Sequence, residues 1–295
     1  MKFGLYRGIS NEKYHEVLPW GEAFVSSSQL KDANEDIEVF HKKYILKEIE
    51  RKEIPAFAIG TYYHTAILEP ELLNEECAVY EGGIRKGKVW DEFKKTNAGK
   101  AIITAKEFLQ ADALIQATKD SPIAMSLLAE GEAEVSLYTE LEGVKVKVRA
   151  DWINFEKGYV LDLKSTTGNA KDVRKVQQKI SSYCYDLSAA LYLDAFNNEL
   201  GKAGEPLLED WYWTFASKDF KNCRTYRASK HNLEVGRSKY KAALRLIKKY
   251  SELGWQFQDE IIELDAASWE KLEWLTEEQR KEIKEVLTGG DEDLL

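Results

Sequence analysis

An aspartate and a lysine lie close together in a strand-like segment near the middle of the chain. The segment 158–166 reads GYVLDLKST, so Asp162 and Lys164 interrupt an otherwise apolar run. Side chains two apart in a strand share one face, about 6 to 7 Å from each other. The carboxylate could bind a divalent metal ion, and the ammonium group could position a water molecule. Together these are the requirements of phosphodiester hydrolysis. A solvated hairpin face is the alternative that Asp-x-Lys alone leaves open.

A second carboxylate is expected opposite this pair. In the segment VKVKVRADW the valines alternate with polar residues, which places Asp151 on the polar face of a strand. A two-residue loop at 156–157 would set a register in which Asp151 opposes Asp162. A bulge at Gly158 would shift this register by one residue. Opposed carboxylates destabilise a sheet unless a cation compensates them, and the candidates are a divalent metal ion and Lys164.

The elements around these residues follow from the periodicity of apolar side chains. After Gly131 the segments AEVSLYTEL, VKVKVRADW and GYVLDLKS alternate with period two, which predicts a strand meander; DWYWTFASKDF and CRTYRAS predict two more strands. The segment 80–95 is predicted to be a glycine-punctuated loop that leads into a helix. Apolar spacings and capping residues predict helices in the segments 26–53, 60–69, 104–116, 123–128, 173–200, 233–253 and 268–287. This order of elements predicts an α/β protein.

The chain shows no internal boundary at the level of sequence. No repeat, low-complexity linker or clear shift of composition divides it. One domain is therefore expected over 1–295, with a mainly helical part at 1–130, the strands and helix that carry the chemistry at 131–230, and C-terminal helices at 231–295.

Composition and charge exclude several classes of protein. Three distant cysteines, Cys77, Cys184 and Cys223, argue against a disulfide framework and against a four-cysteine zinc or iron–sulfur site. No segment is apolar for the eighteen or so residues that a membrane span requires, so a soluble, cytoplasmic protein without membrane contact is expected. The net charge is -9, but the window 145–179 holds nine Lys or Arg against four Asp or Glu. This local excess surrounds the candidate residues and would suit a nucleic-acid backbone.

The spacing of the acidic residues is similar to a known nuclease pattern. An aspartate eleven residues before Asp-x-Lys, on a hairpin that follows a glutamate-bearing strand and precedes a long helix, resembles the PD-(D/E)xK nuclease superfamily. This resemblance implies an α/β fold whose core is a mixed central sheet flanked by helices, here with an N-terminal helical elaboration. Ala150 stands where the superfamily has proline, and Asp151 is retained.

Further motifs resemble the RecE-type phage exonucleases, the exonuclease VIII family. The segments are GTYYHTAILEPE, YVLDLKSTTGNA and YDLSAALYLDAF, and the resemblance extends from ISNEKYHE to EIIELDAASW. It implies a set of metal ligands, which are His64, Asp151, Asp162 and the backbone carbonyl of Leu163. It also implies that Lys164 is the catalytic lysine. Glu134 matches an acidic position of the family and is expected to act with the catalytic residues, on this metal or on a second one.

The helix after the catalytic strands departs from the family pattern. The related nucleases carry glutamine in a motif resembling Tyr-x-x-Gln-x-x-x-Tyr, whereas this chain has Tyr185, Ser188 and Tyr192. Serine can donate a hydrogen bond to a DNA end, but over a shorter reach. Several cations lie at the start of the helix predicted from residue 173, where they are unfavourable to the helix dipole unless an anion is near. A bound phosphate would explain them, and the alternative is that they lie on an ordinary solvated face. The cations concerned, candidates for contact with DNA, are Lys171, Arg174 and Lys175.

The resemblance implies an activity with defined partners. It implies a Mg²⁺-dependent exonuclease that digests linear double-stranded DNA from its ends in phage-type recombination and leaves a strand for a single-strand annealing protein. It also implies ring-shaped homo-oligomers, and the histidine ligand would suit Mn²⁺ as well as Mg²⁺. Two alternatives stay open, a non-catalytic DNA-binding subunit that kept the fold and a site-specific endonuclease on the same core. Retention of Asp151, Asp162 and Lys164 argues against the first, and no sequence-reading module supports the second.

Overall fold

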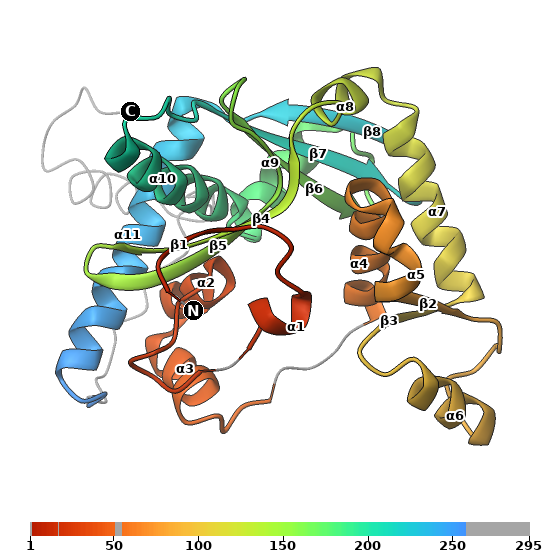
Figure 1. The fold of residues 1–295 in the computed structure, drawn as a ribbon, viewed down its shortest axis with the longest axis horizontal. Coiled ribbons are helices and arrows are strands. Elements are labelled where there is room, and N and C mark those ends of the chain that lie inside the picture. Colours follow the sequence, from red (N-terminus) through yellow and green to blue (C-terminus); the bar gives the residue numbers. More distant parts are fainter. Residues whose placement is uncertain (1, 17, 51–54, 258–295) are drawn as a thin grey trace, which may run out of the picture. The chain divides into compact units, whose positions relative to one another are not determined.

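The computed structural model describes residues 2–16, 18–50 and 55–257 (Figure 1). Residues up to Gln256 form one compact unit. The helix predicted at 268–287 lies outside the described residues, so a single domain over the whole chain stays a prediction. None of the described helices has both the length and the apolar character needed to cross a bilayer.

A six-stranded sheet forms the centre of this unit, in the order β1-β4-β5-β6-β7-β8. Strands β6 and β7 pair in parallel and all other neighbours pair antiparallel, so the predicted mixed sheet is confirmed. The bounds of these strands are β1 Gly4–Tyr6, β4 Glu132–Leu141, β5 Val144–Asn154, β6 Tyr159–Thr166, β7 Asp210–Ser217 and β8 Asn222–Arg227.

The hairpin of β5 and β6 has the predicted register, although its turn comprises the four residues 155–158 and not two. Trp152 pairs with Leu161, and the pairing continues to Asn154 and Tyr159. The same register extended by one step sets Asp151 beside Asp162. Gly158 has a φ of 69°, yet it does not shift the pairing.

Helices cover both faces of the sheet (Figure 1). On one face, α4 and α7 pack over Leu161 and Leu163; on the other, α2, α10 and α11 pack over Val148 and Trp213. Helix α11 approaches α10 closely because residue 236 is glycine, where a Cβ atom would clash with the carbonyl oxygen of Asp186. The principal helices are α2 Ser27–Glu35, α4 Pro55–Leu68, α7 Ala105–Lys119, α9 Val173–Ser182, α10 Tyr185–Ala203 and α11 Lys230–Glu252.

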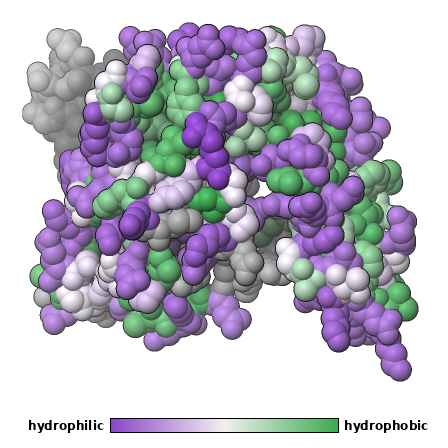
Figure 2. All heavy atoms as spheres, in the orientation of Figure 1, coloured by the Kyte–Doolittle hydropathy of each residue, from purple (hydrophilic) through white to green (hydrophobic). Residues whose placement is uncertain are grey.

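Shorter elements connect these layers. Strands β2 (Cys77–Tyr80) and β3 (Ala101–Thr104) form a separate parallel pair, which the sequence did not predict because four residues are too few to show a period. Hydrophilic side chains predominate on the face that Figure 2 shows. The remaining elements are α1 Asn11–Tyr14, α3 Ile37–Phe40, the π-helical turn η1 His41–Ile45, the 3₁₀ turn η2 Pro70–Leu72, α5 Leu73–Glu76, α6 Lys88–Thr96 and α8 Pro122–Leu127.

Two helices predicted as continuous are interrupted. The segment 26–53 breaks at Asp36, whose backbone is extended and whose carboxylate accepts hydrogen bonds from the backbone N–H groups of Glu38 and Val39. The segment 173–200 breaks at Cys184, which has a left-handed φ of 46° and separates α9 from α10. Each break arises because the backbone of one residue departs from helical φ and ψ angles. The periodicity of apolar residues does not predict such a departure.

Candidate active site

Three ligand-bearing side chains from different elements meet at one end of the hairpin. His64 comes from α4, Glu134 from β4 and Asp151 from β5, and each offers a ligand atom within 4.8 Å of the other two. All three are half-buried. A histidine nitrogen with carboxylate oxygens is a donor set that suits Mn²⁺ or Mg²⁺.

The conformation of Glu134 creates this meeting point. Its φ is 49°, a left-handed value that costs a non-glycine residue roughly 1 to 2 kcal/mol. Ala133 and Val135 pack into opposite cores, although strand residues two apart normally share a face. The ladder of β4 and β5 is interrupted here, because neither Glu134 nor Asp151 pairs within it. Strain of this kind is typical of functional sites.

Asp151 and His64 are held by the backbone of β6. Asp151 Oδ2 accepts a hydrogen bond of 2.8 Å from the N–H of Leu163 and lies 3.5 Å from His64 Nδ1. His64 Nε2 lies 3.1 Å from the Leu163 carbonyl oxygen, which can only accept, so Nε2 carries the proton and Nδ1 is left with a lone pair. Burial lowers the pKa of His64 and favours the neutral imidazole that a metal requires.

Asp162 is paired with a lysine and lies outside the three-residue cluster. Its Oδ1 accepts a hydrogen bond of 2.6 Å from Lys164 Nζ, and it is not one of the three clustered residues. Its Oδ2 is buried and has no hydrogen-bond partner among the described residues. Burial, together with the charge of Asp151, raises the pKa of Asp162 to about 7.

The electrostatics of the carboxylates fit a bound cation. Burial raises the pKa of Glu134 to about 8, and the charge of Asp151 adds to this effect, while Arg149 at 3.7 Å opposes it. The buried Oδ2 of Asp162, which has no hydrogen-bond partner among the described residues, is costly when the carboxylate is charged, and a divalent cation would compensate that cost. His64, Glu134 and Asp151 could hold such an ion, with the free oxygen of Asp162 and the carbonyl of Leu163 beside them.

The neighbouring carboxylates favour the charged form of Lys164. Burial acts to lower its pKa, but the charges of Asp162 and Asp151 outweigh it and raise the pKa well above the ordinary value. Its Nζ atom also lies 4.9 Å from the centre of the Tyr185 ring. An ammonium group in this position can donate hydrogen bonds to water or to phosphate, but it is not a base near neutral pH.

The candidate DNA contacts divide into two groups. Tyr185 on α10 lies beside β6, since its ring centre is 4.9 Å from Lys164 Nζ, and Tyr192 lies on the same helix. The hydroxyl group of Tyr192 lies 3.4 Å from Ser27 Oγ. Ser188, on the same helix, is half-buried and has no side-chain hydrogen bond among the described residues.

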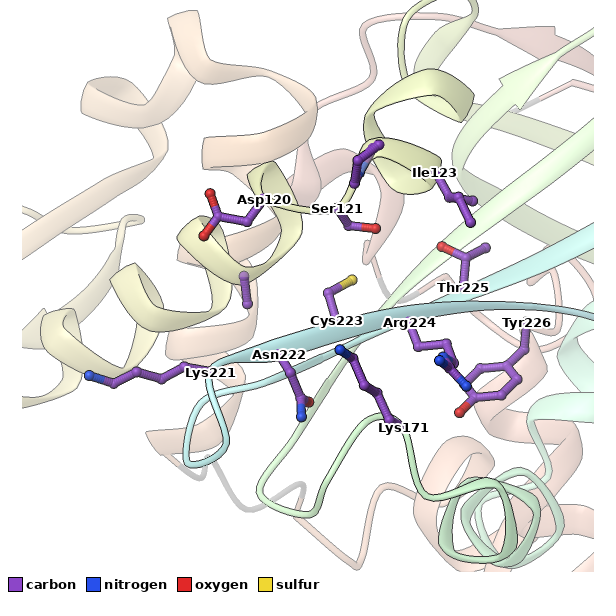
Figure 3. Close-up of a pocket in the computed structure, with 12 residues that line it drawn as sticks. Asp120, Ser121, Ile123, Lys171, Lys221, Asn222, Cys223, Arg224, Thr225 and Tyr226 are labelled. Carbon is purple, nitrogen blue, oxygen red and sulfur yellow. The ribbon is translucent and has the colours of Figure 1, made fainter.

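The basic candidates lie on α9 and in the loop that precedes it. Arg174 and Lys175 are exposed on α9, and Lys175 Nζ lies 3.8 Å from Asp172 Oδ2. Lys171 points from its loop toward β8 and lines a cavity of about 670 Å³ that also includes Arg224 (Figure 3). None of the predicted catalytic residues lines this cavity.

One residue at the site was not predicted from the sequence. Lys31 on α2 places its Nζ atom 5.3 Å from the centre of the Tyr185 ring, the same ring that Lys164 approaches. A lysine in a polar helical segment is ordinarily solvated, and Lys31 lies more than a hundred residues from the catalytic strand. The one feature of the nearby sequence that could have indicated its burial is the preceding residue, Leu30, which is fully buried in the structure.

Comparison with known proteins bears on the family and the fold of the chain. The chain matches the family model described as "PDDEXK-like domain of unknown function (DUF3799)" over residues 26–255. The crystal structure of a "Putative exonuclease" from Eubacterium rectale superposes with a TM-score of 0.60 at 17% identity, covering 89% of this chain and 97% of that chain. The structure of SSO0001 aligns with a TM-score of 0.30 at 15% identity, over 77% of this chain and 85% of that chain. No curated protein matches the chain.

The first of these structural likenesses supports the fold, and the family match covers most of the chain, including every residue of the candidate site. The chain therefore belongs to the family of PDDEXK-like domains DUF3799 and has the PD-(D/E)xK nuclease fold.

Proposed function

We propose that this protein is a metal-dependent deoxyribonuclease that hydrolyses phosphodiester bonds of linear double-stranded DNA from its ends. The observation that supports this most directly is the convergence of His64, Glu134 and Asp151 beside the Asp162–Lys164 pair. Membership of the PDDEXK-like family supports the nuclease class. The end-directed activity rests on the resemblance to the RecE-type exonucleases.

Each residue has a role that its contacts allow. A divalent metal, when bound, would polarise the phosphate and lower the pKa of a water molecule. His64, Glu134 and Asp151 would hold the metal. Leu163 fixes two of them, since its N–H donates to Asp151 and its carbonyl accepts from His64.

Lys164 would act as a positioning cation and not as a general base. Because its pKa lies well above the ordinary value, it donates hydrogen bonds throughout the neutral range. Asp162 orients it through the 2.6 Å bond. The ammonium group can then stabilise the negative charge that grows on phosphate oxygens in the transition state.

The finer part of the proposal concerns the biological setting. We place the protein in the cytoplasm as a RecE-type exonuclease of phage-type recombination, using Mg²⁺ or Mn²⁺ and working with a single-strand annealing protein. A ring-shaped homo-oligomer around the duplex belongs to the same proposal.

The test follows the loss of linear and of circular duplex DNA with Mg²⁺, with Mn²⁺ and with EDTA. Wild-type protein should degrade linear DNA only, and only with metal. Lys164→Ala should reduce the rate about 100-fold or more. Lys157→Ala should not, because Lys157 lies on the turn of the same hairpin, exposed and paired with Glu130.

The other outcomes separate the alternatives. Cleavage of circles would assign the protein to the endonucleases. DNA binding without cleavage in either metal would make it a binding subunit that kept the fold.

A further inference from the structure

Two lysines from distant parts of the chain meet at one aromatic ring beside the candidate active site. Lys31 Nζ lies 5.3 Å and Lys164 Nζ 4.9 Å from the centre of the Tyr185 ring. The negative face of an aromatic ring attracts cations, which explains how each is held there. This attraction does not remove the repulsion between the two ammonium groups, so another interaction is needed to explain why both lysines lie at the ring.

Lys31 has no anionic partner in the described part of the chain. It forms no hydrogen bond and no ion pair there, whereas Lys164 bonds Asp162 at 2.6 Å. Asp186, the other nearby carboxylate, is occupied by Lys239, also at 2.6 Å. Lys31 is therefore half-buried between cations and carboxylates that are already paired.

This arrangement is unfavourable for the chain alone. The pKa of Lys31 is lowered to about 8, chiefly by burial and next by the charge of Lys164. A half-buried ammonium group without a counter-ion is costly, and an anion close to both lysines would reverse the cost.

We infer that Lys31, Lys164 and Tyr185 form a phosphate-binding site, in which Lys31 contacts a phosphate oxygen of the DNA strand that enters the active site. The nearby carboxylates repel anions from the metal side, so the phosphate is held from the side of α2 and α10. The inference rests on the proposed function and specifies how that site holds its substrate.

The test compares DNA binding and stability in full-length wild-type protein and in Lys31→Gln. Binding of a short blunt duplex is measured in EDTA, where no cleavage occurs, over a series of salt concentrations. Lys31→Gln should weaken binding about tenfold or more, because it removes a hydrogen bond to a charged group. It should also make the plot of log affinity against log salt less steep by about one.

Thermal unfolding separates this role from a packing role. Since Lys31 is an unpaired cation beside another, Lys31→Gln should leave the melting temperature unchanged or raise it. Lys31→Arg should retain most of the affinity. Lys202→Gln is the matched control, because Lys202 is exposed at the far end of α10, and both its affinity and its salt slope should equal those of the wild type.

Each other outcome has a distinct meaning. Unchanged affinity and slope in Lys31→Gln would overturn the inference, and so would weaker binding that comes with a lower melting temperature. If the wild type binds and cleaves DNA while Lys31→Gln behaves like it, the proposed function survives and the inference fails. If the wild type neither binds nor cleaves DNA, the proposed function fails and the inference with it.

Discussion

His64 Nε2 lies 3.1 Å from the carbonyl oxygen of Leu163, across 99 positions of sequence. Because a carbonyl oxygen only accepts, the proton sits on Nε2, and Nδ1 faces Asp151 at 3.5 Å. Strand β6 thus selects the tautomer that leaves a nitrogen lone pair, which a metal could use.

Replacing His64 should weaken metal binding while the fold persists. We expect His64→Ala to lower the affinity for Mn²⁺ by about tenfold to a hundredfold, the range found even for residues that only orient ligands. Isothermal titration calorimetry measures it. His231→Ala on α11 is the control, since His231 is exposed. Equal affinities of both variants and the wild type would remove His64 from the metal site.

The stability of the metal-free protein should fall as the pH rises. Glu134, with a pKa of about 8, and Asp162, with a pKa of about 7, both bind protons more tightly in the folded than in the unfolded protein. Their stabilising contribution is complete below about pH 4, the ordinary carboxyl range, and is lost as the pH rises through 7 and 8.

Thermal unfolding in EDTA from pH 5 to pH 9 measures this loss. Glu134→Gln should unfold with a shallower dependence on pH than the wild type, because one titrating carboxyl is removed. Saturating Mn²⁺ should also flatten the wild-type curve, since a cation stabilises the charged carboxylates. Parallel curves for the wild type and Glu134→Gln would contradict the shifted pKa of Glu134.

The left-handed backbone at residue 134 predicts a difference between two small substitutions. Alanine keeps the strain of a φ of 49°, whereas glycine relieves it. Glu134→Gly should therefore have a free energy of unfolding about 1 kcal/mol higher than Glu134→Ala, as measured by urea denaturation. Both should lose metal affinity, because both lack the carboxylate. A less stable glycine variant would mean that the strand is regular at this position in solution.

The cations at the β8 cavity should contribute affinity for DNA without contributing to catalysis. Lys171 and Arg224 are exposed there and form no ion pair among the described residues. The double variant Lys171→Gln/Arg224→Gln should reduce the steepness of the salt dependence by up to about two. The cleavage rate at saturating DNA should stay within about twofold of the wild type, since neither residue lies in the catalytic cluster. A large loss of rate at saturation would place this surface within the active site.

Local sequence determined the hairpin of β5 and β6, which holds Asp151, Asp162 and Lys164. The alternation of apolar and polar residues set the faces of β5 and β6, and the short turn between them set the register that brings Asp151 beside Asp162. These features are fixed by neighbours along the chain, so a period and a loop length are enough to predict them. The order of elements predicted an α/β protein, and the resemblance to the PD-(D/E)xK nucleases implied the mixed sheet flanked by helices that the structure has.

Tertiary structure decided which residues gather around that hairpin. Glu134 faces Asp151 and His64 because its own φ is left-handed, which no period reveals. Lys31 reaches the ring of Tyr185 only because α2 packs on α10. Such contacts join segments far apart in sequence, and their geometry depends on the packing of whole elements. The sequence by itself therefore determined the strand with Asp162 and Lys164, whereas the tertiary structure decided what surrounds it.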